Sequence, residues 1–301
     1  MTLFAPLLLL ACDAARSPTD TPVQDDSGHD SGGVTGDTGD PLPANVAQVA
    51  ISGWTACALD VDGRVHCWGL DESGLATPPA GVFNQISGGG TYFCGLEVDG
   101  TMRCWGATDS MYGRPDTPLV TFDAGFQHAC GLDASGMVLC WGENDFGEAS
   151  APSGSYTMVS VGSIASCAVQ PTGKPTCWGS EINDQLEPPA DPLLMLSLSM
   201  FHACGVRTTD AEAVCWGEDM MGQLNTKPGP FALVEAGYLA SCGLRTTGEL
   251  VCWGDAHSPP LGTYTDVALG EDFGCAVTTE RKVECWGNNE YGQAEPPAHL
   301  R

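Results

Sequence analysis

Cysteine is the residue type in this sequence whose spacing most clearly points to chemistry. The chain has 15 cysteines among 301 residues, and 14 of them form seven local pairs. The second member of each pair opens the tripeptide Cys-Trp-Gly, and the first lies ten residues upstream, or eleven in the fifth pair. The pairs are Cys57 with Cys67, Cys94 with Cys104, Cys130 with Cys140, Cys167 with Cys177, Cys204 with Cys215, Cys242 with Cys252 and Cys275 with Cys285. Paired cysteines of this kind either close disulfide bonds or ligate metal ions.

The spacing within each pair favours disulfides over zinc. Structural zinc sites use close knuckles of the CxxC type, whereas here about ten strand-like residues separate the partners. In the first pair, a three-residue turn at Val61-Asp62-Gly63 places Cys57 opposite Cys67. Directly opposed residues of antiparallel strands have Cα atoms about 4.5 to 5.5 Å apart, which a disulfide tolerates. Each pair therefore predicts a β-hairpin closed by a disulfide, with zinc as the alternative.

The hairpin turns depend on a glycine in the left-handed conformation, which closes a three-residue turn without steric cost. Four further repeats have a glycine where the first has Gly63, at Gly100, Gly136, Gly173 and Gly248. The fifth turn has one extra residue and the seventh has Arg281 in place of glycine. We therefore expect those two turns to differ from the others.

The hairpins belong to a repeat that fills the chain from Val46 to its end. Cys-Trp-Gly occurs seven times, at steps of 37, 36, 37, 38, 37 and 33 residues. Each unit has room for three or four short strands, and no segment shows helical periodicity. An open array of such hairpins would leave long exposed edges, which a closed ring removes. We predict an all-β fold, a seven-bladed β-propeller with one disulfide-stapled hairpin per blade, preceded by a disordered tether.

The repeats resemble those of the regulator of chromosome condensation family. The clearest matches are Gly125-Phe-Gln-His128-Ala-Cys130-Gly-Leu132 and the Cys285-Trp-Gly close with its Tyr291-Gly-Gln293 tail. The resemblance implies a seven-bladed β-propeller and extends from Val46 to about Pro297. The sixth unit departs from the pattern because no Tyr-Gly-Gln tail follows Trp253-Gly254, so we expect a shortened loop there.

Several aromatic and histidine side chains could bind ligands, but packing explains most of them. One Trp per blade at a fixed position is what contacts between blades require. Trp54 lies outside this set and is a better candidate for exposure. His128 and His202 occupy equivalent positions, but the family pattern has His there without a metal. We predict no metal site, no cofactor and no catalytic residues, since no nucleophile elbow, Walker loop or HExxH motif occurs.

The segments that follow Cys-Trp-Gly vary most between repeats and are rich in acids. Repetition places equivalent positions on one face, so these acids should form a broken ring around one mouth of the propeller. This candidate binding face comprises Asp71, Glu72, Asp109, Glu143, Asp145, Glu181, Asp184, Glu218, Asp219, Asp255 and Glu290. The alternative is that the acids only keep the protein soluble.

The N-terminal segment predicts export and lipid anchoring. Leu7-Leu8-Leu9-Leu10-Ala11-Cys12 resembles a bacterial lipobox, in which the cysteine becomes the lipidated first residue. Residues 1–11 would then be a lipoprotein signal peptide, although no Lys or Arg precedes the apolar run. An ordinary cleaved signal is the alternative. The following residues, to position 45, contain seven acids and one Arg, which predicts a disordered acidic linker before the propeller at 46–301.

Overall composition narrows the partners. Eleven Lys and Arg against 38 Asp and Glu give a net charge of −27, so nucleic acid would be repelled. No apolar run reaches the roughly 18 residues that cross a bilayer, which leaves Cys12 as the only predicted membrane attachment. Seven disulfides also require an oxidising compartment. We expect a monomer at the bacterial cell envelope, on the outer membrane or cell surface, with the inner membrane or secretion as alternatives.

These observations favour a non-catalytic module that binds a protein or a glycan. A rigid scaffold with variable loops and no catalytic set is typical of such modules. Three alternatives remain. The first is an enzyme inhibitor resembling the β-lactamase-inhibiting propeller of the same repeat family. The second is a guanine-nucleotide exchange factor, as in the eukaryotic namesake. The third is a propeller glycosidase or lyase, since two acids from different blades leave no linear motif.

Overall fold

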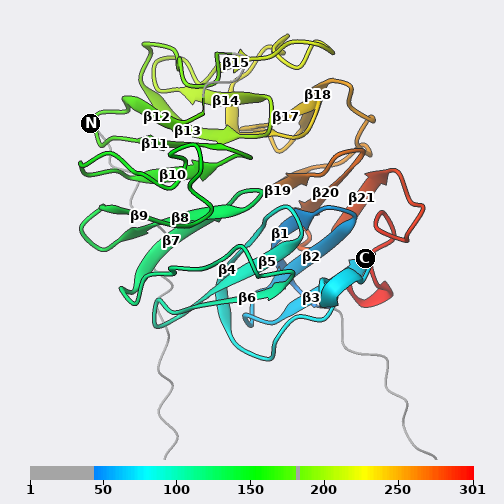
Figure 1. Ribbon diagram of the computed structural model, residues 1–301. Helices are drawn as coiled ribbons and strands as arrows, with labels where there is room; N and C mark the ends of the chain where they lie inside the picture. The colour runs from blue at the N-terminus through cyan, green and yellow to red at the C-terminus, as the bar shows by residue number, and fades with distance from the viewer. Residues whose placement is uncertain (1–43, 181–183) are drawn as a thin grey trace, which may run out of the picture. The chain divides into compact units, whose positions relative to one another are not determined.

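The structure is a computed structural model that describes residues 44–180 and 184–301. These residues form seven three-stranded antiparallel sheets, each built from one repeat with its strands in sequence order (Figure 1). The first strands are β1 (Val46–Ser52), β4 (Phe83–Gly88), β7 (Leu119–Ala124), β10 (Met158–Val161), β13 (Leu193–Leu198), β16 (Phe231–Ala236) and β19 (Tyr264–Leu269).

The second and third strands of each sheet form the predicted hairpin. The second strands are β2 (Thr55–Asp60), β5 (Tyr92–Glu97), β8 (His128–Asp133), β11 (Ala165–Val169), β14 (His202–Arg207), β17 (Ala240–Arg245) and β20 (Phe273–Thr278). The third strands are β3 (Val65–Gly69), β6 (Met102–Gly106), β9 (Val138–Gly142), β12 (Pro175–Gly179), β15 (Ala213–Gly217), β18 (Leu250–Gly254) and β21 (Val283–Gly287). Two short 3₁₀ helices, η1 (Glu72–Gly74) and η2 (Ala298–Leu300), complete the described elements.

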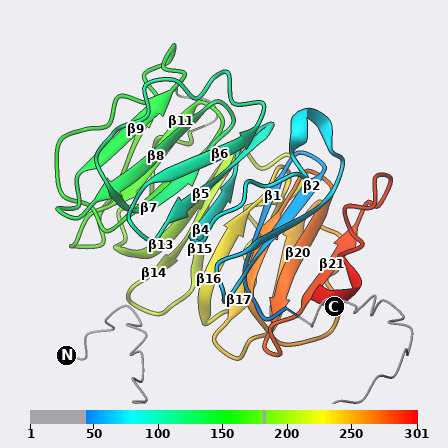
Figure 2. The ribbon, with the colours of Figure 1, turned by 90° about the horizontal axis from the view of Figure 1, so that it is seen from below.

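The seven sheets are the blades of a closed propeller. Each first strand contacts the first strand of the next blade, and β1 contacts β19 of the last blade, which closes the ring. Figure 2 shows β1 and β2 beside β20 and β21. In the described residues all three strands of every blade come from the same repeat, so none of these blades combines strands from the two ends of the chain. The predicted fold class is confirmed.

All seven predicted cysteine pairs are disulfide-bonded. In every hairpin the two cysteines lie directly opposite each other in the antiparallel register, with Cα atoms 4.0–4.1 Å apart. The bonds join Cys57 and Cys67, Cys94 and Cys104, Cys130 and Cys140, Cys167 and Cys177, Cys204 and Cys215, Cys242 and Cys252, and Cys275 and Cys285. The first cysteine of each pair lies on the central strand and is fully buried. The disulfides therefore cross-link the middle strand of each blade to its outer neighbour, and the zinc alternative is wrong.

One prediction about the hairpin turns is wrong. Gly63 and its equivalents have positive φ, as expected, but Arg281 has φ 62° at the same position of the seventh turn. The turn closes in the same way in both cases, because Gly63 N–H donates to Asp60 O and Arg281 N–H donates to Thr278 O. The left-handed conformation costs a non-glycine residue roughly 1–2 kcal/mol, which the surrounding blade must offset. The fifth turn, with its extra residue, places Ala211 at φ 58°.

The core lies between blades. Each Trp of Cys-Trp-Gly is at most 9% exposed and shares a buried cluster with the first cysteine of the preceding blade. Trp68, for example, packs with Cys275 and Val277 of the last blade. The seven Trp are therefore packing residues, as predicted. Because each cluster takes side chains from two neighbouring blades, a blade is stabilised by the ring as well as by its own disulfide.

Candidate binding face and central channel

The segments that follow Cys-Trp-Gly, which we call the tail loops, lie against the turns that join the first and second strands, which we call the first turns. One backbone hydrogen bond fixes this arrangement in all seven blades. The second residue after Trp donates its N–H to the carbonyl of the last residue of the first turn, at 2.8–3.1 Å. The bonds are Leu70 to Trp54, Ala107 to Thr91, Glu143 to Gln127, Ser180 to Ile164, Glu218 to Phe201, Asp255 to Leu239 and Asn288 to Asp272. Together the tail loops and first turns form one surface, the tail-loop face.

The Tyr-Gly-Gln tail has a structural role at the junction between blades. In the last repeat, Gly292 has positive φ and Gln293 is fully buried, with its Oε1 accepting a hydrogen bond from Tyr291 N–H. The backbone carbonyl of Gln293 accepts a hydrogen bond from Trp68 Nε1 of the first blade at 2.8 Å. The same contact joins Trp105 to Leu75, Trp178 to Glu148, Trp216 to Gln185 and Trp253 to Gln223. In these five places the tail thus fastens one repeat to the next, and the contact of Gln293 with Trp68 spans the closure of the ring.

The acids predicted to form a ring occur on these tail loops, except Glu181, which lies outside the described residues. Some brace their own loop: Asp71 accepts hydrogen bonds from Ala76 N–H and Thr77 Oγ1, and Asp219 accepts one from Leu224 N–H. Glu143 accepts a hydrogen bond from the hydroxyl of Tyr112. Asp145 projects into solvent. The structure therefore gives part of the acidic ring a local structural role, and whether the ring binds a ligand stays a prediction.

The tail-loop face carries one cationic residue in its described segments, Arg114, which occupies the place of the tail Gln in the second repeat. No other Lys or Arg occurs in the first turns or in the tail loops at 69–75, 106–114, 142–148, 179–180, 184–185, 217–223, 254–262 and 287–293. Six of the eleven cationic residues lie instead at the hairpin turns or at the strand ends beside them: Arg64, Lys174, Arg207, Arg245, Arg281 and Lys282. The two ends of the propeller therefore differ in charge, because acids outnumber cations more strongly on the tail-loop face than at the hairpin turns.

Large apolar side chains are exposed on the same face. Phe126 and Met200 occupy first turns and are 51% and 43% exposed. Tail loops expose six more: Tyr112, Phe146, Met220, Met221, Leu261 and Tyr291. Trp54, the candidate for exposure, is partly buried, with its ring centroid 6.1 Å from that of Tyr291. Sequence analysis missed these residues, although the signal was present. The residue before the tail glycine is large and apolar in four repeats, at Tyr112, Phe146, Met221 and Tyr291.

The first strands line a central channel with a volume of about 380 Å³. Its polar side chains join neighbouring blades, because they bond to backbone groups of the next first strand. Gln48, for example, donates to Ile86 O and accepts from Ile86 N–H, and Asp266 Oδ2 accepts from Val49 N–H across the ring closure. These contacts satisfy backbone groups that would otherwise be unpaired at the inner edge of each sheet.

Three channel side chains are carboxylic acids, which the sequence analysis did not single out. Asp123 accepts four hydrogen bonds, from Ser87 Oγ, Ala124 N–H, Ser160 Oγ and Val161 N–H. Burial raises its pKa. Burial likewise raises the pKa of Asp266 to about 7. Burial, together with the charges of Asp123 and Asp266, raises the pKa of Glu235 to about 8. The signal was a polar residue seven positions before the first cysteine of a pair, as in Asp123 and Glu235.

His128 and His202 each link two blades. His128 Nε2 lies 2.8 Å from Ser166 Oγ, and His202 Nε2 lies 2.7 Å from Ser241 Oγ, both on the following blade. Both histidines are fully buried, and burial lowers the pKa of each to about 4. They are therefore neutral at pH 7 and act in packing. In the described part of the chain, no three His, Cys, Asp or Glu side chains are arranged to hold a metal ion.

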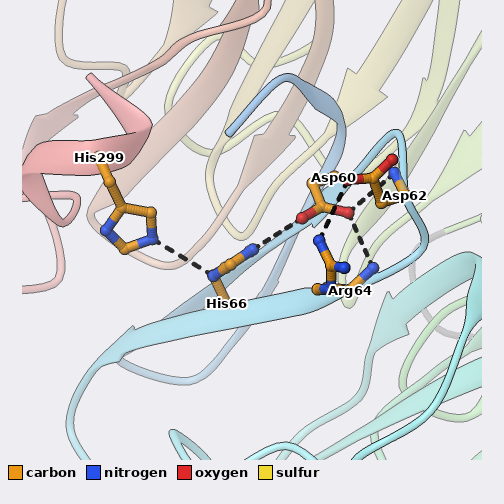
Figure 3. Close-up of polar contacts among 5 residues, drawn as sticks. All are labelled: Asp60, Asp62, Arg64, His66 and His299. Carbon is orange, nitrogen blue, oxygen red and sulfur yellow. Dashed lines mark hydrogen bonds and ion pairs between the residues drawn. The ribbon is translucent and has the colours of Figure 1, made fainter. Parts of the chain in front are cut away.

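A second polar cluster joins the first repeat to the C-terminal helix η2 (Figure 3). His66 Nε2 lies 3.0 Å from Asp60 Oδ2, and His66 Nδ1 lies 3.3 Å from His299 Nε2. Asp60 also accepts hydrogen bonds from the N–H groups of Asp62 and Arg64. Burial acts to raise the pKa of Asp60, but the bond with His66 and the backbone donors outweigh it and lower that pKa. Burial and the neighbouring His66 lower the pKa of His299. The cluster strengthens the ring closure.

Comparison with known proteins identifies the repeats. The sequence pattern of the regulator of chromosome condensation (RCC1) repeat matches residues 46–74, 120–148 and 264–293. The chain carries regulator of chromosome condensation repeats. Each matched segment begins at or near the first strand of a blade and ends in a tail loop, so one repeat corresponds to one blade. No curated protein sequence matches the chain significantly.

Solved structures with a similar fold include the ectodomains of two receptor kinases. The entire ectodomain of the Physcomitrella patens receptor kinase CR4 is similar at a TM-score of 0.71 and 26% identity, over 81% of this chain and 74% of that one. The CRINKLY WD40 ectodomain of the Arabidopsis thaliana receptor kinase ACR4 is similar at a TM-score of 0.69 and 25% identity, over 81% of this chain and 98% of that one. Prp20p from Saccharomyces cerevisiae, described with its binding to Gsp1p and histones, shares the fold. Its TM-score is 0.63 at 15% identity, over 76% of this chain and 81% of that one.

Proposed function

We propose that this chain is an exported, lipid-anchored propeller that binds a protein partner through its tail-loop face. The observation that carries the proposal is the composition of that face. It combines exposed Phe, Tyr and Met side chains with a surround of carboxylates and, in its described segments, has one cation, Arg114. Exposed aromatic and Met side chains grouped on one surface are typical of protein interfaces. Partners with a basic rim would be attracted to this surface and steered onto it.

Export is supported by the disulfides and by the relatives. Seven disulfide bonds indicate an oxidising compartment. The two receptor-kinase relatives at 25–26% identity are ectodomains, which are the extracellular parts of receptors. No helix in the described residues is long and apolar enough to cross a bilayer. We propose that a lipid on Cys12, outside the described residues, attaches the protein to the cell envelope.

Binding through the tail-loop face is tested by capture of partners with matched variants. The wild-type propeller, Phe126→Asp and Met221→Asp are immobilised and exposed to envelope and extracellular proteins of the producing cells. The control is Val98→Asp, which changes an even more exposed apolar residue at a hairpin turn. We expect both face variants to lose the partners that wild type and the control retain. Equal capture by all four proteins would refute the proposal.

The lipid anchor is tested by intact mass. Protein from the membrane fraction of the producing cells should begin at Cys12, carry a diacyl or triacyl group and gain 14 Da on reduction of seven disulfides. An unlipidated chain that retains Met1 would refute both anchoring and processing.

A further inference from the structure

The central channel opens onto the tail-loop face through an apolar collar. A second cavity, of about 200 Å³, forms the mouth of the channel on that face and is lined by Phe126, Met200 and Tyr238 of the first turns. Mouth and channel share one lining residue from each blade, and we call this ring the collar. It consists of Ile51, Gly88, Ala124, Val161, Leu198, Ala236 and Leu269. Every collar residue is apolar, and three are Gly or Ala, which leaves space at the centre.

One carboxyl group directly below the collar has spare hydrogen-bonding capacity. Glu235 precedes the collar residue Ala236 on β16 and lines the channel. A carboxylate can accept about four hydrogen bonds. Asp123 accepts four, whereas Glu235 accepts one among the described residues, from Ser197 Oγ at 3.2 Å through Oε2. Glu235 therefore lines the cavity with an Oε1 atom that has no protein donor among the described residues.

The surroundings of Glu235 contain acids and no cation. Asp123 on β7 and Asp266 on β19 are the other titratable groups of the channel lining, which has no Lys, Arg or His. The mouth adds Glu271 and likewise no cation. A positive group placed at Glu235 would pair with a carboxylate that the protein itself leaves unpaired. It would have to pass the apolar collar, which suits a cation at the end of an aliphatic chain.

We propose that the protein partner inserts a lysine- or arginine-type side chain through the collar and places its charge on Glu235. This inference rests on the proposed function, since the same tail-loop face receives the partner. The aliphatic part of the inserted chain packs against the collar, and its head group donates to Glu235 Oε1. A single long side chain held in a desolvated pocket at the centre of an interface is typical of a binding hot spot. The exposed apolar residues and acids of the face surround that point.

The test uses small probes of defined charge. Nα-acetyl-lysine amide, Nα-acetyl-arginine amide and Nα-acetyl-norleucine amide are titrated into the complete protein and followed by NMR at the methyl groups of Ala124 and Ala236. We expect saturable shifts with the lysine or arginine probe and an affinity at least tenfold lower for the norleucine probe. Glu235→Gln should lower the affinity for the cationic probe at least tenfold. Asp145→Asn, a change to an exposed acid of the face, should alter the affinity less than threefold.

The pH dependence gives an independent readout. Binding of a cation releases the proton that Glu235 holds at neutral pH, so the affinity should rise between pH 6 and pH 8 in wild type. The pH effect should be smaller in Glu235→Gln, in which only Asp123 and Asp266 remain to titrate. The melting temperature of Glu235→Gln at pH 6 shows whether the variant is folded.

Several outcomes would overturn the inference. They are equal affinity for the norleucine and cationic probes, no shift of the collar methyl groups with either cation, or unchanged binding in folded Glu235→Gln. Pentane-1,5-diamine binding tenfold more tightly than the lysine probe would overturn the assignment to a protein side chain in favour of a free amine. The capture experiment separates the two proposals. If Phe126→Asp loses its partners and Glu235→Gln keeps them, the inserted cation is refuted and the binding face remains.

Discussion

Glu235→Gln is expected to stabilise the propeller strongly at alkaline pH and only slightly at pH 5. Burial in the channel and the charges of Asp123 and Asp266 raise the pKa of Glu235 to about 8, from 4.5 in the absence of these effects. The folded protein therefore binds more protons than the unfolded chain between these two pH values. Stability contributed by the neutral form is complete below about pH 4.5 and is lost as pH rises through 8. Glutamine keeps the shape and a hydrogen-bond acceptor for Ser197 without the charge.

The magnitude follows from the size of the pKa change. One pKa unit corresponds to 1.36 kcal/mol, so the full effect of a shift from 4.5 to about 8 is about 5 kcal/mol. At pH 5 Glu235 is protonated in the folded protein and has only partly lost its proton in the unfolded chain, so its ionisation lowers the free energy of unfolding by only about 1 kcal/mol. The free energy of unfolding of Glu235→Gln, relative to wild type, should therefore rise by about 4 kcal/mol between pH 5 and pH 9. For a domain of this size that corresponds to about 10 °C in melting temperature.

The assay is thermal or denaturant unfolding of wild type and variant at pH 5, 7 and 9, with the disulfides intact. Asp145→Asn is the matched control, because it removes a carboxylate that is exposed on the tail-loop face and outside the channel. Its difference from wild type should stay within about 0.5 kcal/mol at all three pH values. An advantage of Glu235→Gln that is the same at pH 5 and pH 9 would show that Glu235 ionises without cost in the folded protein, and would refute the reasoning.

Three further predictions concern the contacts that hold the blades together. Trp253→Phe leaves the buried Gln223 carbonyl without its indole donor, whereas Trp141 Nε1 is buried without a hydrogen-bond partner among the described residues. Trp253→Phe should therefore lower the free energy of unfolding by about 1–3 kcal/mol more than Trp141→Phe. Equal losses in chemical denaturation would contradict this. Because burial lowers the pKa of His202 to about 4, stability should fall by about 3 kcal/mol as pH drops from 6.5 to 4, and His202→Gln should remove that part of the pH dependence of unfolding. Replacing Cys57 and Cys67 together by serine should cost roughly 2–3 kcal/mol in the chain-entropy model, measured by denaturation without reductant; an unchanged midpoint would show that the ring alone fixes the first hairpin.

The sequence determined the repeating parts of this protein. Cysteines ten residues apart across a turn can bond only if the chain folds back between them, so the spacing set the hairpins, their register and the disulfides. Seven units of similar length, each with one Cys-Trp-Gly, set the number of blades and assigned the Trp of that tripeptide to the core. These features depend on residues close together in the chain, where local geometry leaves few alternatives. Arg281 is the exception, because the surrounding blade holds it in a conformation that its side chain disfavours.

Only the tertiary structure decided what the ring encloses and what it presents. Asp266 bonds to Val49 across the closure, and Gln293 binds Trp68, so these contacts join positions more than 200 residues apart. The proximity of Glu235 to Asp123 and Asp266 arises because the first strands of different blades converge on one axis. The exposed apolar residues belong to one surface only because each tail loop bonds to a first turn. Charge coupling and surface composition depend on distances between blades, which no local pattern in the sequence contains.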